Sequence, residues 1–224
     1  MLENDVKKVI FSSSAAIYGN PIYYPIDEKH PQNPVNPYGQ TKLIIEKIMD
    51  DYDRLYGLKS IRLRYFNVVG ADPKGRIGEW HDPETHLIPN ILKSTFCGGK
   101  TFDIYGDDYD TKDGTCARDY VNVEDLINAH LKSLEYLNSS EETNFFNIGT
   151  NKGYSVKEVF AECEKVTNIT INRNKISRRE GDPAVLIADY TKAKKVLGWH
   201  PDKTLKDSIS SAYEWEKMLN NMVG

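Results

Sequence analysis

Apolar residues in the first third of the chain follow two different spacings. Residues 8–12 and 60–66 are short runs rich in β-branched, aliphatic and aromatic side chains, which predicts two buried strands. Between these runs, from residue 43 to residue 52, apolar side chains recur every three or four positions, as on one face of a helix. This helix should begin at Asn36-Pro37, an N-cap followed by a proline at the first helical position, and end at Gly57. A strand, a helix and a strand at this spacing predict a parallel βαβ unit and an α/β fold.

Beyond residue 67 the pattern is less regular, and the expected elements are shorter. Apolar runs and helical spacing predict short strands at 101–104, 119–121 and 145–148 and helices at 87–96, 123–136, 155–167, 191–197 and 205–218. No glycine-rich phosphate loop of the G-x-G-x-x-G kind occurs in the 224 residues.

Composition and charge narrow the classes of partner. A net charge of −4 gives no electrostatic reason to expect nucleic acid or an anionic membrane as a partner, and no apolar run is long enough to span a bilayer. Cys97, Cys116 and Cys163 are odd in number and lack metal-type spacing, so we expect reduced thiols in a cytoplasmic protein and no metal site. Cys116 has no histidine or second cysteine close in sequence and is expected to be structural.

Tyr38 and Lys42 are the strongest chemical candidates. A tyrosine and a lysine four residues apart lie on the same face of a helix. Free tyrosine ionises near pH 10, so a phenolate at pH 7 needs about 4 kcal/mol of stabilisation. An ammonium about 6 Å away supplies roughly 2–3 kcal/mol of this, and a second positive charge could supply the remainder. The pair is therefore suited to deprotonating an alcohol beside a cationic cofactor.

The surroundings of this pair distinguish it from a second one with the same spacing. Tyr190 and Lys194 repeat the spacing in a polar late segment that has no serine-rich strand before it. Ser14, in contrast, ends the first expected strand, where ligands of open α/β sheets bind. Its hydroxyl could bond the same substrate oxygen as Tyr38, or it could simply satisfy a turn.

Several later polar residues could bind a diphosphate or a sugar. Arg118 and the pair Arg178-Arg179 could bind a diphosphate through bidentate contacts, or they could be solvated surface residues. Asp182 could bind sugar hydroxyl groups or cap the turn after Gly181.

Six segments taken together resemble one known family. They are residues 11–19, 36–42, 64–71, 113–120, 178–182 and 197–201. These segments, spread over essentially the whole chain, resemble the extended short-chain dehydrogenase/reductases, and among these the UDP-glucose 4-epimerase family.

The resemblance implies a fold and a set of site residues. The fold would be the C-terminal part of a Rossmann-type parallel sheet, formed by residues 1–70 with 122–150 returning to it. A smaller α/β substrate-binding domain would comprise mainly residues 71–121 and 151–224. Tyr38, Lys42 and Ser14 would be catalytic. The cofactor NAD would contact Ser14, Tyr38, Lys42, Tyr65 and Phe66. The UDP-sugar substrate would contact Ser14, Asn67, His86, Leu87, Tyr105, Arg118, Arg179 and Asp182.

The implied reaction is 4-epimerisation of UDP-glucose and UDP-galactose, with hydride transfer at C4 through a 4-keto sugar and Tyr38 as acid and base. Members of the family are usually homodimers. Three or four strand-helix units carrying the glycine loop would precede Met1 in a complete member. We therefore expect residues 1–224 alone to bind NAD poorly, to show little epimerase activity and to expose apolar surface on the first strand and helix.

Alternative functions differ in the residues they require. A 4,6-dehydratase needs an acidic pair after the strand serine, where this chain has Ala15-Ala16. Epimerases of UDP-N-acetylhexosamines, UDP-pentoses or UDP-uronic acids remain open, as does a non-catalytic, truncated sugar-nucleotide-binding remnant. Leu186 falls where side-chain size is thought to control acceptance of N-acetylated sugars, so partial tolerance of these is expected. His86 stands where asparagine is common in the family, which is expected to alter a contact to the diphosphate. Ala16 stands where threonine is common, which removes one hydroxyl near the sugar.

Overall fold

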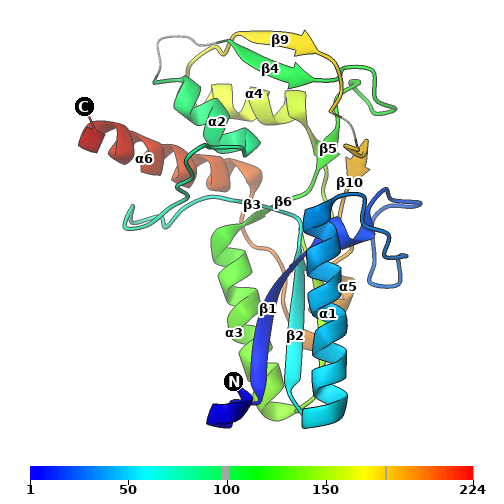
Figure 1. Cartoon of the computed structure of the whole chain (residues 1–224). Coiled ribbons are helices and arrows are strands. Elements are labelled where there is room, and N and C mark those ends of the chain that lie inside the picture. The colour runs from blue at the N-terminus through cyan, green and yellow to red at the C-terminus, as the bar shows by residue number, and fades with distance from the viewer. Residues whose placement is uncertain (97–100, 180, 224) are drawn as a thin grey trace.

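The computed structural model describes residues 1–96, 101–179 and 181–223. Two lobes are joined by short strands, with the N-terminus at the far end of the lower lobe and the C-terminus in the upper one (Figure 1). Cys97 lies outside the described residues.

The lower lobe is built on a parallel sheet of order β1-β2-β7. Its strands are β1 (Lys8–Ser14), β2 (Lys59–Tyr65) and β7 (Asn144–Ile148). β1 and β2 run parallel with Ser14 opposite Tyr65, and α1 (Pro37–Tyr56) connects them through the short 3-10 helix η2 (Ala15–Tyr18) and a loop. The predicted βαβ unit is therefore confirmed, and the α/β fold class with it.

Alternate residues of β2 face opposite sides of the sheet, as the two-residue period of a strand requires. Ile61 and Leu63 belong to a core with α3 (Val123–Ser139) and α5 (Thr191–Leu197). Arg62 and Arg64 face α1 instead, where they pair with acidic side chains. The two faces are thus held differently, one by apolar packing and the other by buried charge.

The pair on the α1 face is Arg64 and Glu46, and both side chains are at least 97% buried. Arg64 donates to the two Glu46 carboxylate oxygens at 3.0 and 2.6 Å, a bidentate geometry. Ser13 of β1 donates to Glu46 at 2.5 Å, and the Tyr18 hydroxyl accepts from Arg64 at 3.0 Å. This network fixes α1 against β1 and β2.

The ends of α1 agree with the sequence prediction. The Asn36 side chain accepts from the backbone N–H of Gly39 at 2.8 Å, and Gly57 ends the helix in the left-handed region at φ 67°. Asn122 caps α3 in the same way, by accepting from Glu124 N at 2.8 Å.

The upper lobe packs three helices on a two-stranded parallel sheet. The helices are α2 (Leu87–Ser94), α4 (Val156–Thr167) and α6 (Leu205–Val223), and the strands are β4 (Phe102–Tyr105) and β9 (Arg173–Ile176). Their apolar faces form one core around Phe160, Ile91 and Ile209. All three of these helices were predicted; β9 was not, because its polar residues show no strand-like alternation.

Short strands connect the lobes. β3 (Asn67–Val69) pairs with β6 (Tyr120–Asn122), and β5 (Ala117–Arg118) lies between β10 (Val185–Leu186) and β8 (Tyr154–Ser155). The remaining element is η1 (Leu2–Asn4), a 3-10 turn before β1. α5, at residues 191–197, packs on β7 and α3 in the lower lobe rather than with the upper one. The domain bounds drawn from the sequence otherwise stay a prediction.

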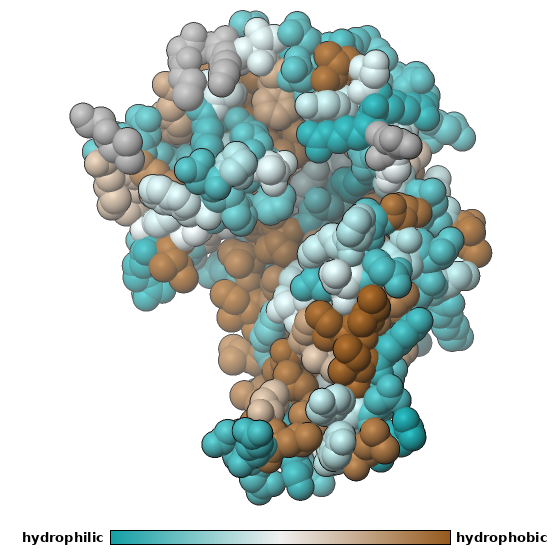
Figure 2. Space-filling view, viewed as in Figure 1, coloured by the Kyte–Doolittle hydropathy of each residue, from teal (hydrophilic) through white to brown (hydrophobic). Residues whose placement is uncertain are grey.

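Among the described residues, no helix combines the length and apolar character that crossing a membrane requires. Cys116 and Cys163 are buried free thiols. Figure 2 shows apolar surface over the outer side of α1. The exposed apolar residues on that helix include Ile44, Ile48, Tyr52 and Leu55.

Candidate active site

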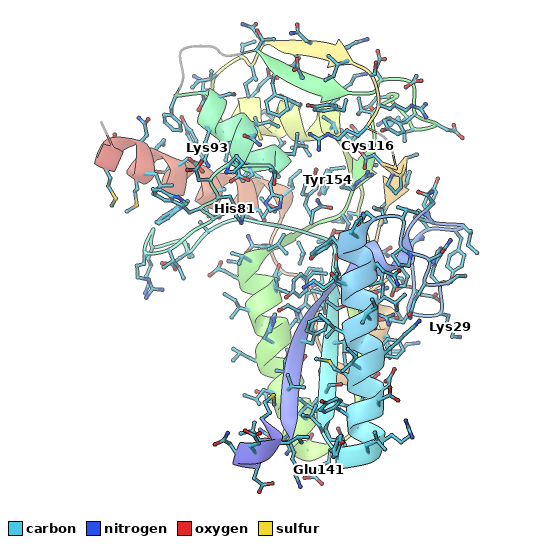
Figure 3. All side chains as sticks on the ribbon, viewed as in Figure 1. Lys29, His81, Lys93, Cys116, Glu141 and Tyr154 are labelled. Atoms are coloured by element: carbon cyan, nitrogen blue, oxygen red, sulfur yellow. The ribbon has the colours of Figure 1, made fainter. Side chains whose placement is uncertain are left out.

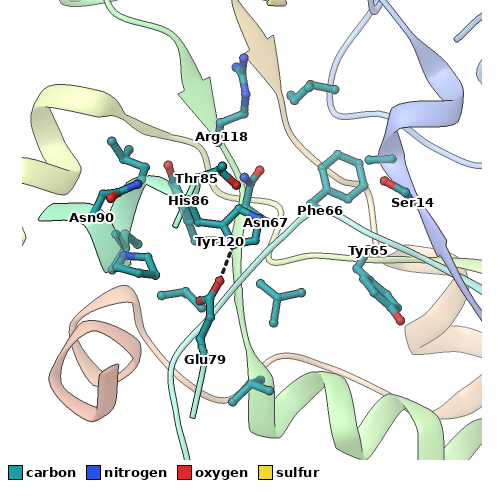
Figure 4. Close-up of a pocket in the computed structure, with 18 of the residues that line it drawn as sticks. Ser14, Tyr65, Phe66, Asn67, Glu79, Thr85, His86, Asn90, Arg118 and Tyr120 are labelled. Atoms are coloured by element: carbon teal, nitrogen blue, oxygen red, sulfur yellow. Dashed lines mark hydrogen bonds and ion pairs between the residues drawn. The ribbon is translucent and has the colours of Figure 1, made fainter. Parts of the chain in front are cut away.

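One large cleft opens between the two lobes, beyond the carboxyl ends of β1 and β2. Its volume is about 1240 Å³. Ligands of open α/β sheets bind at this position, because strand-end loops and helix N-termini converge there. Figure 4 shows residues from both lobes around the cleft, with Ser14 and Tyr65 on one side and His86 and Asn90 on the other.

The cleft collects nearly all of the residues singled out from the sequence. Of the twelve candidate catalytic, cofactor-binding and substrate-binding residues, eleven line it. These are Ser14, Tyr38, Tyr65, Phe66, Asn67, His86, Leu87, Tyr105, Arg118, Arg179 and Asp182. The twelfth, Lys42, lies directly behind Tyr38.

Tyr38 and Lys42 lie on one face of the first turns of α1. The Lys42 ammonium is 5.4 Å from the centroid of the Tyr38 ring and 5.1 Å from that of Phe11. It donates to the backbone oxygen of Ser12 at 2.9 Å, so β1 fixes its position. The side chain is therefore held beside the phenol instead of moving freely in solvent.

A glycine lets the start of α1 approach the end of β1. A Cβ added at Gly39 would lie 2.4 Å from the backbone oxygen of Ala16. Any larger residue would push the helix away from η2, and with it Tyr38 from Ser14.

Ser14 has two roles in this geometry. Its hydroxyl oxygen accepts from the backbone N–H of Ala16 at 3.1 Å, which caps η2, and the same side chain lines the cleft. The hydroxyl proton is left free to be donated. Tyr65 follows on the neighbouring strand, and burial raises the pKa of its phenol.

Basic side chains line the upper part of the cleft. Arg118 is nearly buried, pairs with Asp182 and donates to the backbone oxygen of Ala117 at 2.7 Å. The Arg179 guanidinium lies 4.0 Å from the centroid of the Tyr105 ring. Two arginines and an aromatic ring on one wall can hold a nucleoside diphosphate.

Not every candidate reaches the cleft. Arg178 turns away from its neighbour Arg179 and pairs with Asp108 at 2.6 Å, with its guanidinium over the Tyr109 ring. Of these two arginines, Arg179 lines the cleft and Arg178 does not. Tyr190 packs against Trp199 with ring centroids 5.8 Å apart, and neither it nor Lys194 lines the cleft.

Cys116 lines the cleft but is not suited to nucleophilic chemistry. Burial raises the pKa of its thiol, despite the opposing charge of Arg118. A thiol that resists ionisation is a poor nucleophile, in agreement with the structural role expected from the sequence.

Sequence reasoning missed Asp119, which lies between the lobes. Its buried carboxylate accepts from Thr150 N and Oγ1, at 2.8 and 2.6 Å, and from Ala188 N at 3.1 Å. Burial raises its pKa to about 6 against the effect of these hydrogen bonds. No local signal marks it, because its partners are 31 and 69 residues away.

Sequence reasoning also missed Glu79, which contacts the His86 imidazole on the cleft wall (Figure 4). Here the sequence did carry a signal, since Glu79, His81, Glu84 and His86 occur within eight residues.

The chain matches a known family and known proteins over most of its length. The sequence model of the family described as GDP-mannose 4,6 dehydratase matches residues 1–212. The UDP-glucose 4-epimerase of Lactobacillus helveticus is 53% identical over 218 residues, which is 97% of this chain and 66% of that protein. The chain thus spans slightly less than two thirds of the length of this relative.

Solved structures of UDP-glucose 4-epimerases share the fold. The UDP-glucose 4-epimerase of Stenotrophomonas maltophila, with bound NAD and formylated UDP-arabinopyranose, superimposes with a TM-score of 0.96 at 34% identity. The match covers 99% of this chain and 67% of that one. The enzyme of Bifidobacterium longum, in complex with NAD+ and UDP, gives a TM-score of 0.92 at 40% identity, with coverage of 99% and 67%. The chain therefore belongs to the UDP-glucose 4-epimerase family, within the extended short-chain dehydrogenase/reductases.

Proposed function

We propose that this chain carries the catalytic and UDP-sugar-binding side of an NAD-dependent UDP-hexose 4-epimerase that interconverts UDP-glucose and UDP-galactose. The observation that carries the proposal is the convergence of Tyr38, Ser14 and Arg179 on one cleft, with Lys42 fixed behind the tyrosine. Residues suited to proton transfer and an arginine suited to binding a diphosphate thus face the same cleft.

The residues fit the nicotinamide end of NAD. Tyr65 and Phe66 supply aromatic surface beside Ser14 and Tyr38 at the carboxyl end of the sheet, where a dinucleotide binds in folds of this kind. When bound, NAD supplies the hydride acceptor and donor for C4 of the sugar. The 224 residues hold no glycine-rich loop for the pyrophosphate, so this chain alone is expected to bind NAD weakly and to turn over slowly.

Tyr38 is proposed to exchange the proton of the C4 hydroxyl. Loss of hydride from C4 requires that the hydroxyl lose its proton, and a phenolate beside the Lys42 ammonium can take it and later return it. The Ser14 hydroxyl can donate to the same sugar oxygen, because its capping bond uses only its oxygen. Ser12, through its backbone oxygen, keeps the ammonium in place during both steps.

The uridine diphosphate is proposed to lie against Arg179, Arg118 and Tyr105. An anchored diphosphate would leave the sugar free to present either face of C4, which epimerisation needs. His86, Leu87, Asn67 and Asp182 complete this side of the cleft.

A second class of UDP-sugar could also be a substrate. Leu186 lines the cleft, and we propose that it admits UDP-N-acetylhexosamines in part. If the chain converts UDP-galactose but does not detectably convert UDP-N-acetylglucosamine, the proposal that it accepts N-acetylated sugars is wrong. UDP-pentoses and UDP-uronic acids can be tested in the same assay.

UDP alone tests the binding half of the proposal. We expect calorimetric titration to show one UDP site, weakened by about tenfold in Arg179→Met. Arg178→Met is the matched control, because the neighbouring arginine points away from the cleft, and it should bind UDP as the wild type does. Equal affinity for all three proteins would contradict the proposed diphosphate wall.

Turnover tests the catalytic half. UDP-galactose and NAD at millimolar concentration should yield UDP-glucose with the wild-type chain. UDP binding with no conversion would instead favour the alternative function, a non-catalytic sugar-nucleotide-binding remnant.

We further propose that this protein acts in the cytoplasm as a homodimer. Two buried free thiols fit a reducing compartment. The apolar stripe of Ile44, Ile48, Tyr52 and Leu55 on α1 fits a helical face covered by a partner or by further chain.

A further inference from the structure

Four metal-ligating side chains gather on the segment between β3 and α2. Glu79, His81, Glu84 and His86 each offer one ligand atom, and these atoms all lie within 4.8 Å of one another. Figure 3 shows His81 beside α2, close to Lys93. The geometry points to a binding site for one zinc-like divalent transition-metal ion formed by these two histidines and two glutamates.

The distances suit such an ion. His81 Nδ1 lies 3.2 Å from a Glu79 oxygen and 3.6 Å from a Glu84 oxygen, and His86 Nδ1 lies 3.8 Å from the other Glu84 oxygen. Ligands about 2.0–2.2 Å from a tetrahedral ion are about 3.4 Å apart. The contact between His86 Nδ1 and Glu79 would therefore lengthen, and ligand atoms up to 4.8 Å apart would move closer, when an ion binds. The two imidazole rings are 5.0 Å apart and perpendicular, which lets both Nδ1 atoms approach one point.

The Glu84 carboxylate and the backbone of the loop are held by a second layer of contacts, as is usual around metal ligands. Glu84 is 5% exposed, and one of its oxygens accepts from the backbone N–H groups of Thr85 and His86 at 2.8 and 2.9 Å. The Glu84 backbone oxygen accepts from Asn90 of α2 at 3.1 Å, and that of Glu79 accepts from Trp215 of α6 at 2.9 Å. The loop is thus fixed to two helices before any ion binds.

Charge around the cluster also favours a cation. Glu79 and Glu84 carry two negative charges, and the carboxyl group of Glu216 on α6 lies close enough to interact with both. Lys93, 3.4 Å from Glu84, is the cation paired with this group among the described residues. The carboxylates of Glu79 and Glu84 against one ammonium leave an excess of negative charge when the histidines are neutral, and a divalent ion would offset it.

The donor set selects the kind of ion. Two imidazole nitrogens and two carboxylate oxygens suit Zn²⁺, Co²⁺ or Ni²⁺, whereas Mg²⁺ and Ca²⁺ prefer oxygen ligands alone. This site departs from the sequence expectation, which found no metal-type spacing among the cysteines and did not consider the histidines. The ion would sit on the cleft wall, because Glu79, His81 and His86 all line the cleft.

Metal titration of the EDTA-treated, dialysed chain tests the proposal without any substrate. We expect Zn²⁺ to bind at a ratio of one ion per chain with micromolar or tighter affinity, and Co²⁺ to give the visible absorption of a four-coordinate site. His81→Ala should weaken Zn²⁺ binding by about tenfold or more. Zn²⁺ should also raise the Tm of the wild type but not that of His81→Ala.

His200→Ala is the matched control, because His200 pairs with Asp202 at 3.0 Å on an exposed surface outside the cluster. It should bind Zn²⁺ as the wild type does. Circular dichroism of both variants in EDTA checks that they fold. The proposal is overturned if Zn²⁺ does not bind, if His81→Ala binds it as well as the wild type, or if Mg²⁺ binds equally well.

Discussion

Glu46→Ala should destabilise the lower lobe more than any exposed charge substitution on α1. The Glu46 carboxylate is the partner of a guanidinium that is 98% buried, and it also accepts from Ser13. Its removal leaves Arg64 charged and buried, with the Tyr18 hydroxyl as its one remaining side-chain hydrogen-bond partner among the residues that the structure describes. Breaking a buried ion pair in this way typically costs about 3–5 kcal/mol.

That cost is a large share of the 5–15 kcal/mol that typical proteins have as their free energy of unfolding. Replacing both members, as Glu46→Leu with Arg64→Met, should recover most of the loss, because no charge then stays buried without a partner. Asp51→Ala breaks the exposed Asp51–Arg54 pair on the same helix and is the control; it should cost less than about 0.5 kcal/mol.

Urea denaturation followed by circular dichroism measures all three changes. A loss below about 1 kcal/mol for Glu46→Ala would show that the buried ion pair does not make this contribution to stability. So would a double variant no more stable than the single one, since the cost would then arise from lost packing and not from the unpaired charge. A destabilised network should also loosen the placement of Tyr38 and Lys42, which precede Glu46 by two turns and one turn of α1.

Three further predictions follow from the same geometry. Lys42→Met should lower epimerase turnover by about a hundredfold while leaving UDP affinity unchanged, because the ammonium acts on Tyr38 and lies outside the cleft lining; equal turnover would contradict its role. The unfolding free energy of the wild type relative to Asp119→Asn should fall by about 3 kcal/mol between about pH 4 and pH 6. The pKa of Asp119 is higher in the folded state than in the unfolded state, so the folded state keeps the proton over this pH range and its ionisation at higher pH lowers the free energy of unfolding. Denaturation of both proteins at several pH values measures the difference, and a difference that does not change with pH would contradict this prediction. Ile48→Lys should reduce self-association in analytical ultracentrifugation, because Ile48 is exposed on the apolar face of α1, and an unchanged sedimentation profile would count against that interface.

The sequence predicted the lower lobe well because its signals are local. Apolar runs define β1 and β2, and the Asn36 cap and the Gly57 stop define α1 between them. Tyr38, Lys42 and Ser14 could be placed together because a parallel βαβ unit brings a strand end and the following helix to one edge of the sheet.

The remaining features depend on contacts between distant segments. β10 is only two residues long, and no periodicity can define it; it exists because Leu186 lies beside Arg118 of β5. Arg178 and Arg179 are equivalent in sequence, and only the position of Asp108, 70 residues away, decides which one leaves the cleft. The buried environment of Asp119 likewise depends on the fold, which places Thr150 and Ala188 within hydrogen-bonding distance of its carboxylate.

The proton-transfer role of Tyr38 is tested most directly by Tyr38→Phe, which removes one hydroxyl from the cleft. Turnover of UDP-galactose at millimolar NAD and affinity for UDP should be measured on the wild type and the variant in parallel. We expect a loss of turnover of about a hundredfold to ten-thousandfold with UDP affinity unchanged. Turnover within about threefold of the wild type would contradict it, because the acid and base would then have to be another group.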